Sequence, residues 1–155
     1  MLANIRARRG FSLIELVIVV LILGIIAAIA VPRMSRGAKG AQDSSVASDL
    51  AVLRNAIDMY HTEHNAFPLV AKFAGQLTTY TDDSGAPQAT SDATHIYGPY
   101  LRAVPGLPVG TEKGSTGVAA AAGAGVGWIY NETTGVITAN SGTATDSAGV
   151  LYTTY

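Results

Sequence analysis

FSLIELVIVVLILGIIAAIAVP, residues 11–32, is the stretch of sequence that decides the fold. From Leu16 to Val31 it contains no polar side chain. As a helix, residues 11–31 would be about 31 Å long at roughly 1.5 Å per residue, which matches the hydrocarbon core of a membrane. A globular core in a chain of 155 residues does not need so uniformly apolar a helix. The segment is therefore predicted to insert into a membrane.

Charge is distributed unevenly around this segment. Residues 1–40 hold six basic residues and one acid, Glu15, whereas residues 41–155 hold four basic residues and ten acids. The C-terminal part thus lacks the basic surface that nucleic acid requires, and no nucleic-acid partner is expected. The chain has no cysteine, which excludes a disulfide framework and a thiolate metal site.

Three interpretations of the apolar segment compete. It could be a plain single-span anchor, a secretory signal cut after Ala30 to release a soluble binding domain, or a specialised leader followed by a retained helix. Pro32, directly after the first residue past the cut, disfavours the signal. The anchor must accommodate Glu15, whose charge costs about 2.5–3.5 kcal/mol at the bilayer centre and less near the interface. Glu15 either snorkels to the headgroups or pairs with a cation that appears later.

Residues 8–16, RRGFSLIEL, closely resemble the processing site of type IV pilins and type II secretion pseudopilins. The resemblance implies that a prepilin peptidase cuts after Gly10 and methylates the new N-terminal residue, Phe11. It also implies that the Phe11 ammonium lies close to Glu15 of a neighbouring subunit in a filament. Gly24 and Pro32 are the two weak points of the helix, between which related filaments can lose helical structure on assembly. Removing the leader removes three arginines and no acid, so the net charge changes from -1 to -4.

Apolar residues after the span repeat with helical spacing. Intervals of 4, 3, 4 and 3 place five of them on one helix face: Val46, Leu50, Leu53, Ile57 and Tyr60. Arg54 and Asp58 lie off this face and are predicted to form an i,i+4 pair. The helix is predicted to continue past Pro32 and to end near residues 64–65, because residues 67–68, Phe-Pro, oppose further helix.

The rest of the chain is predicted to consist of loops and short strands. Residues 69–80 suit a short helix or turn, residues 81–95 a loop, and the Gly- and Ala-rich residues 110–127 a long flexible excursion. Residues 128–139 have the pattern of a β-hairpin around a glycine-containing turn. Residues 150–155 are predicted to form a last strand.

These elements define an α+β fold class. One long N-terminal helix, apolar in its first half and amphipathic in its second, packs on a small antiparallel β-sheet with long loops. The chain is accordingly divided into four segments: a leader peptide (1–10), a transmembrane or filament-core helix (11–32), its amphipathic continuation (33–66), and a loop-rich C-terminal part with the sheet (67–155).

Candidate metal ligands are scattered along the C-terminal part. Five loop acids offer oxygen ligands that suit calcium, although their spacing matches no EF-hand: Asp82, Asp83, Asp92, Glu132 and Asp146. His61 and His64 share nearly one helix face, but zinc needs at least one more ligand, and His95 is unplaced. No Ser-His-Asp or paired-carboxylate arrangement stands out, so neither catalytic residues nor enzyme activity are expected.

Further residues are similar to the major, G-type pseudopilins: Tyr97–Leu101, Trp128–Asn131 and Thr134-Gly135. Such proteins often stabilise a C-terminal loop with calcium, whereas many type IV pilins close it with a disulfide. The Asp-Pro-Trp-Gly run usual in the G type is missing here. Calcium is therefore the one cofactor to consider.

The resemblance implies a structural role. The chain is expected to be a type II secretion pseudopilin that drives protein export, or alternatively a type IV pilus subunit for adhesion, motility or DNA uptake. Implied partners are copies of the chain, the prepilin peptidase, and an assembly platform in the inner membrane with its ATPase. The implied location is the bacterial inner membrane, crossed once, with a periplasmic C-terminal domain that later enters an extracytoplasmic filament.

Overall fold

The computed structural model describes residues 10–155, apart from the side chain at position 32. The predicted leader lies outside the described residues except for Gly10. The chain divides into two compact units, Met1–Ala38 and Lys39–Tyr155. The first contains the apolar segment, and the second contains the whole apolar core found in the described residues, from Val46 to Tyr152.

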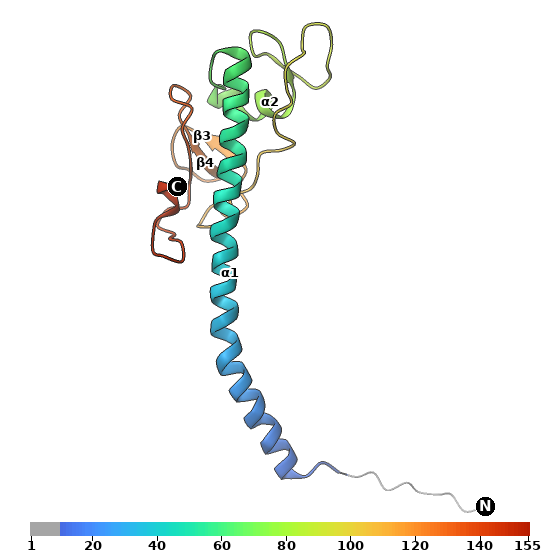
Figure 1. Ribbon diagram of the computed structural model, residues 1–155, viewed down its shortest axis with the longest axis vertical. Helices are drawn as coiled ribbons and strands as arrows, with labels where there is room; N and C mark the ends of the chain where they lie inside the picture. The colour runs from blue at the N-terminus through green and yellow to red at the C-terminus, as the bar shows by residue number, and fades with distance from the viewer. Residues whose placement is uncertain (1–9) are drawn as a thin grey trace, which may run out of the picture. The chain divides into compact units, whose positions relative to one another are not determined.

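Helix α1 (Leu13–His64) contains both the apolar segment and its amphipathic continuation (Figure 1). The predicted continuation past Pro32 is confirmed. The helix ends one residue before Asn65, whose φ of 50° is the left-handed conformation common just after a helix C-terminus. A buried Pro68 follows, so the predicted end is also confirmed.

Short elements make up the rest of the second unit. The 3-10 helix η1 (Val70–Lys72) and helix α2 (Phe73–Thr78) confirm the predicted helical turn. Strands β1 (Tyr80–Thr81) and β2 (Pro87–Gln88) form an antiparallel pair. Strands β3 (Gly117–Ala119), β4 (Val126–Tyr130) and β5 (Ile137–Ala139) form a three-stranded sheet, and η2 (Tyr152–Thr154) is a final 3-10 turn.

The predicted hairpin is confirmed, because β4 and β5 pair antiparallel, with Trp128 opposite Ala139. Its turn is closed by the N–H of Gly135, which donates to the carbonyl of Asn131 at 2.9 Å. Gly135 has a φ of 71°, and a Cβ there would collide with the ring of Phe67. The turn thus requires glycine twice, for its backbone conformation and for the space that Phe67 occupies.

Two predicted features of the C-terminal part need correction. Residues 117–119, expected within a flexible excursion, form β3, which pairs parallel to β4, so the sheet is mixed rather than purely antiparallel. Three residues are too few for a periodic signal. The expected strand at 150–155 is wrong: Leu151 makes only an isolated bridge to Thr145, and η2 follows. Tyr152 is 2% exposed, so its ring belongs to the core.

The predicted helix face is the foundation of the core. All five of its apolar residues are buried, and they form one cluster with residues of α2, β4 and β5, among them Phe73, Leu77, Trp128, Tyr130 and Ile137. The structure does not form the predicted Arg54–Asp58 pair. Arg54 donates instead to the main-chain oxygens of Ile137, at 3.3 Å, and Tyr155.

A core truncation tests this packing. Leu53 is fully buried, so Leu53→Ala in the fragment 39–155 should lower the free energy of unfolding by about 2–5 kcal/mol, through lost transfer energy and a residual cavity. The neighbouring Val52 is 48% exposed, and Val52→Ala is the matched control, expected within about 0.5 kcal/mol of wild type. Urea denaturation measures both. Equal effects of the two changes would contradict the assigned helix face.

Candidate processing and assembly site

Glu15 caps the start of helix α1. Its Oε2 accepts the main-chain N–H of Ser12, the residue before the helix, at 2.8 Å. The carbonyl of Ser12 accepts the N–H of Leu16 at 3.2 Å, which is the first turn of the helix. A serine with a glutamate three residues later, bonded back to the serine N–H, is half of a capping box. The negative charge in the first turn also complements the helix dipole.

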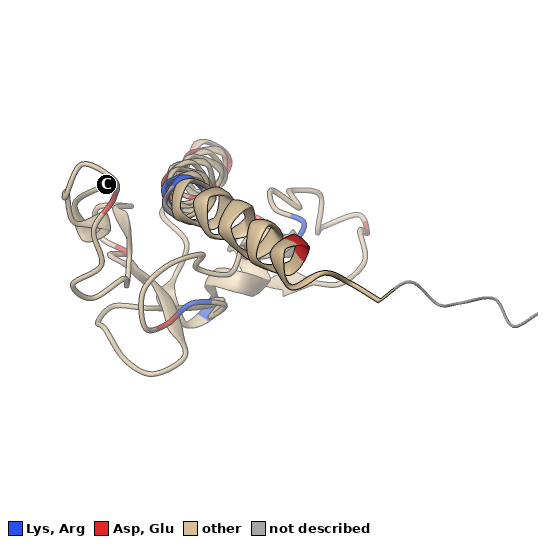
Figure 2. Ribbon diagram, turned by 90° about the horizontal axis from the view of Figure 1, so that it is seen from below, with Lys and Arg blue, Asp and Glu red and all other residues tan. Residues whose placement is uncertain are grey.

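This cap gives Glu15 a role within its own chain, without any contact to a neighbouring subunit. The sequence reasoning missed it, although the pattern Ser12-x-x-Glu15 ahead of an apolar run is the signature that would have found it. In Figure 2 the first turns of α1 are tan apart from a red patch near the helix start, in accordance with Glu15 as the acid of the first turn.

The predicted scissile bond lies outside the helix. Gly10, Phe11 and Ser12 have no regular structure, and Phe11 is 85% exposed. A peptidase therefore reaches the Gly10–Phe11 bond without unwinding α1. Cleavage there creates an ammonium group on Phe11, with a reference pKa near 8, directly before the N–H that Glu15 accepts. Gly10, Phe11 and Glu15, the three residues predicted for processing and assembly, thus lie at or just before the first turn of α1, and their roles stay predictions.

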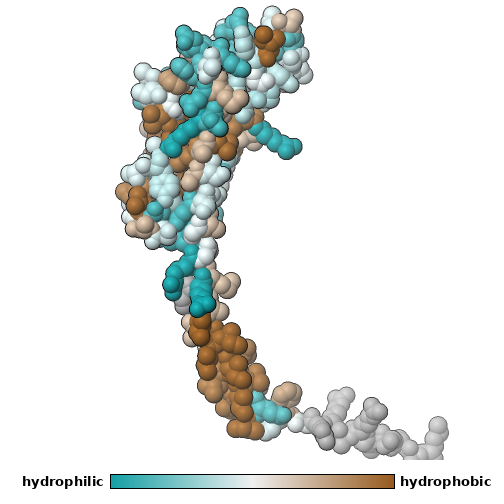
Figure 3. Space-filling model, in the orientation of Figure 1, coloured by the Kyte–Doolittle hydropathy of each residue, from teal (hydrophilic) through white to brown (hydrophobic). Residues whose placement is uncertain are grey.

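The apolar side chains that follow have no partner within the described part of the chain. Every Leu, Ile and Val from Leu13 to Val31 is 48% to 80% exposed, all round the helix. Figure 3 shows this stretch as a continuous brown surface. Among the described residues, α1 is the one helix long and apolar enough to cross a membrane. A surface of this size requires lipid or other protein chains to cover it.

Residues 5–31 match the family model for the prokaryotic N-terminal methylation motif. This match supports a type IV pilin-like protein. It spans the processing site, Glu15 and the apolar segment, and it implies cleavage by a prepilin peptidase and assembly of pilin-like subunits. No curated protein and no solved structure matches the chain.

Gly24 and Pro32, predicted as weak points, both lie within α1. No atom from outside the local helix backbone lies within 4 Å of the position that a Cβ would take at Gly24. The space around it is therefore free for a neighbouring helix or for lipid. Loss of helix between these residues on assembly stays a prediction.

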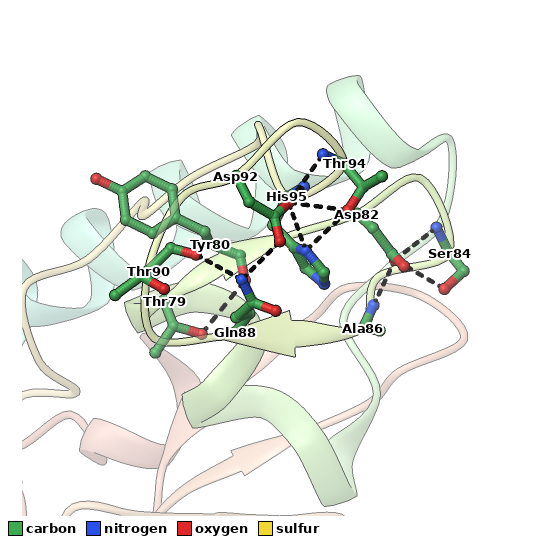
Figure 4. A network of polar contacts seen from close by, with 10 residues as sticks. All are labelled: Thr79, Tyr80, Asp82, Ser84, Ala86, Gln88, Thr90, Asp92, Thr94 and His95. Carbon is green, nitrogen blue, oxygen red and sulfur yellow. Dashed lines mark hydrogen bonds and ion pairs between the residues drawn. The ribbon is translucent and has the colours of Figure 1, made fainter.

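The five candidate calcium ligands do not converge. Asp92 accepts bonds from the N–H of His95 at 2.8 Å, the Nδ1 of the same histidine at 2.9 Å, and the amide of Gln88 at 2.8 Å (Figure 4). These donors, the His95 N–H above all, hold the pKa of the Asp92 carboxyl well below its usual range. Asp82 similarly accepts hydrogen bonds from the N–H groups of Ala86 and Ser84, at 2.9 Å each.

The other three acids are also hydrogen-bonded within the protein, two of them to other segments of the chain and one within its own turn. Asp83 accepts the Tyr97 hydroxyl at 2.7 Å, Glu132 accepts the N–H of Val70 at 2.7 Å, and Asp146 accepts two N–H groups of its own turn. In residues 10–155 no three His, Cys, Asp or Glu side chains are grouped as a metal site.

The histidines are likewise engaged separately. The ring of His61 stacks on Phe67 at 4.2 Å between centroids, and that of His64 stacks on Tyr60 at 4.1 Å. His95 bonds to Asp92, three residues earlier in the same loop. The two helix histidines therefore serve the packing of aromatic side chains at the end of α1.

Calcium binding stays a prediction of the resemblance, and the geometry offers it no converging ligands. At free calcium 100 times Kd, a native-state site would add about 2.7 kcal/mol of stability, on the order of 10 °C in Tm for a domain of this size. We expect no shift of that size in the fragment 39–155 between millimolar calcium and a chelator, measured by thermal melting. A reproducible rise in calcium would show that loop carbonyls or rearranged acids bind the ion.

Proposed function

We propose that the chain is a structural subunit of a pilus-like filament, a type II secretion pseudopilin of the G type that assembles through helix α1 to drive protein export. One observation carries the proposal. The stretch of α1 from Leu13 to Val31, exposed and apolar on every side, bears a single charge, Glu15, beside an accessible cleavage site. A plain anchor would use the apolar surface and the Glu15 cap, but it would have no use for a cleavage site beside them.

Cleavage and assembly give Glu15 a second role. While the subunit waits in the membrane, lipid covers the apolar side chains and Glu15 caps its own helix near the interface. In a filament, neighbouring copies replace the lipid, and Glu15 and the Phe11 ammonium enter a low dielectric together. A pair of this kind need not stabilise more than apolar side chains would. It sets the axial register, because a displaced subunit would leave both charges unpaired.

Other observations weigh against the alternatives. Ala30 lies inside α1, whereas the Gly10–Phe11 bond lies outside it, so a cut after Ala30 would have to unwind the helix. This disfavours a secreted binding domain. The absence of cysteine and the likeness at Tyr97–Leu101 favour a pseudopilin over a type IV pilus subunit. The subunit would then act in the inner membrane and periplasm with an assembly platform and its ATPase.

The mature N-terminus is the first test of this proposal. We expect Phe11, carrying one added methyl group, when the chain is expressed in a strain with an active prepilin peptidase. Mass analysis of the purified protein measures it. A mature protein that begins at Val31 would support the secreted domain instead, and an uncut Met1 would support a plain anchor.

Two substitutions at Glu15 separate its charge from its capping role. Glu15→Leu removes both, whereas Glu15→Gln keeps an oxygen that can accept the Ser12 N–H. We expect both variants to insert and to be processed normally, because removing the charge lowers the cost of insertion. We expect both to lose filaments, because an unpaired buried charge costs about 3–5 kcal/mol at each subunit interface.

The measurement is the yield of sheared filaments, with each variant expressed as the only copy and its processing confirmed by mass. Normal filaments from both variants would reject the Glu15–Phe11 pairing as the determinant of assembly. Loss of filaments in Glu15→Leu alone would assign the requirement to the helix cap.

A further inference from the structure

Residues 144–155, which we call the C-terminal strap, are tied to α1 by one carboxylate. Asp43 lies on α1, near the start of the second unit. Its Oδ2 accepts the N–H of Ser147 at 3.1 Å, and its Oδ1 accepts the hydroxyl of Tyr152. Both bonds join residues more than 100 positions apart, so they close the chain between its helix and its last residues.

A second carboxylate shapes the strap itself. The Oδ1 of Asp146 accepts the N–H groups of Ala148 and Val150, each at 2.8 Å, and its Oδ2 accepts the hydroxyl of Tyr155 at 2.6 Å. The rings of Tyr152 and Tyr155 meet edge to face, with centroids 5.3 Å apart. The two carboxylate–tyrosine bonds therefore lie side by side on one small aromatic cluster.

Arg54 supplies another contact about three turns further along α1. Its Nη2 donates to the main-chain oxygens of Tyr155 and Ile137. It thus joins the end of the strap to strand β5 as well as to the helix.

One apolar residue of the strap is fully buried, and two others, Ala144 and Tyr155, are partly buried against the core. Tyr152 is 2% exposed, but Val150 and Leu151 are 48% and 40% exposed. The chain has no cysteine with which to fix this segment covalently. Polar anchors must therefore contribute a large share of what holds the strap in place.

We propose that the C-terminal strap opens and closes on α1 as a separate unit, that the Asp43–Tyr152 and Asp146–Tyr155 bonds keep it closed, and that acid opens it. Opening would uncover the side of α1 that carries the start of its buried face, while α2 and the β4–β5 hairpin stay folded. The inference rests on the contacts of the second unit and is independent of the proposed filament function.

The hydrogen bonds and charges around the two carboxylates support the proposal that acid opens the strap. The pKa of Asp43 is lowered by its bonds to Ser147 and Tyr152 and, more weakly, by Lys39 on the same helix. The pKa of Asp146 is lowered by its bond to Tyr155 and by the Val150 N–H, against the opposing effects of burial and, more weakly, of the Asp43 charge. The Asp146 bond also raises the pKa of Tyr155 to about 12, as expected for a hydroxyl that donates to a carboxylate.

The sign of the pH effect follows from these directions. A carboxyl whose pKa is lower in the folded state stabilises that state above its unfolded pKa, about 4. This contribution is lost as the pH falls through the lowered folded values. The strap should therefore be closed at neutral pH and open in acid.

Hydrogen exchange of the full chain in detergent at neutral pH tests whether the strap is a separate unit. Tyr152→Phe keeps the buried ring and removes one anchor, and we expect roughly tenfold faster exchange in residues 144–155 with no change in β4 and β5. Asp43→Ala should have at least the same effect, and the double variant should exchange no faster than Asp43→Ala, because the two residues share a bond. Tyr130→Phe is the control, since this buried hydroxyl has no hydrogen-bond partner among the described residues.

Three results would overturn the proposal: unchanged exchange in the strap, fully additive effects of the two changes, or acceleration that extends equally into β4 and β5. The acid response is tested by the amide resonance of Ser147 in the full chain. In wild type it should shift with a midpoint below about pH 4, as Asp43 protonates, and in Asp43→Asn this transition should be absent. The proposal that acid opens the strap would be rejected by a Ser147 resonance that is constant between neutral and acid pH, or by a transition that persists in Asp43→Asn.

Discussion

The rest of the structure depends on one constraint, which is that the apolar first half of α1 has no partner within the described chain. Its side chains are exposed all round the helix, so no single neighbouring face could cover them. Lipid can do so, and so can several copies of the same helix. The single acid in this region caps the helix, and in the proposed filament it would also neutralise the new N-terminus.

The second half of α1 meets a different requirement. Its buried face, from Val46 to Tyr60, supplies the core of the Lys39–Tyr155 unit. The opposite face exposes mostly polar and small side chains, together with Val52 and Met59. Polar bonds then fix the loops that lack regular structure. Asp92 and Asp82 order the segment around β2, and Asp43, Asp146 and Arg54 hold the C-terminal strap. Carboxylates in this unit thus fix loop geometry.

Features with a local periodic signal were predictable from the sequence, and those set by distant contacts were not. The spacing from Val46 to Tyr60 predicted the buried face, and the glycine-containing turn predicted the β4–β5 hairpin. Strand β3 and the turn η2 escaped prediction because each has three residues and depends on its partners. Arg54 was assigned to Asp58 because a helix-only rule ignores the carbonyls of Ile137 and Tyr155. At the processing site the three key residues were predicted, but the capping bond was overlooked.

The central claim is that copies of the chain bury the apolar half of α1 against one another. Electron cryo-microscopy of filaments sheared from cells that express the chain tests it most directly. The account predicts a core made of the segments from Phe11 to Val31, with density joining each Phe11 N-terminus to a Glu15 side chain and the Lys39–Tyr155 units outside. Filaments whose core consists of the Lys39–Tyr155 units, with the apolar segments outside it, would contradict the account.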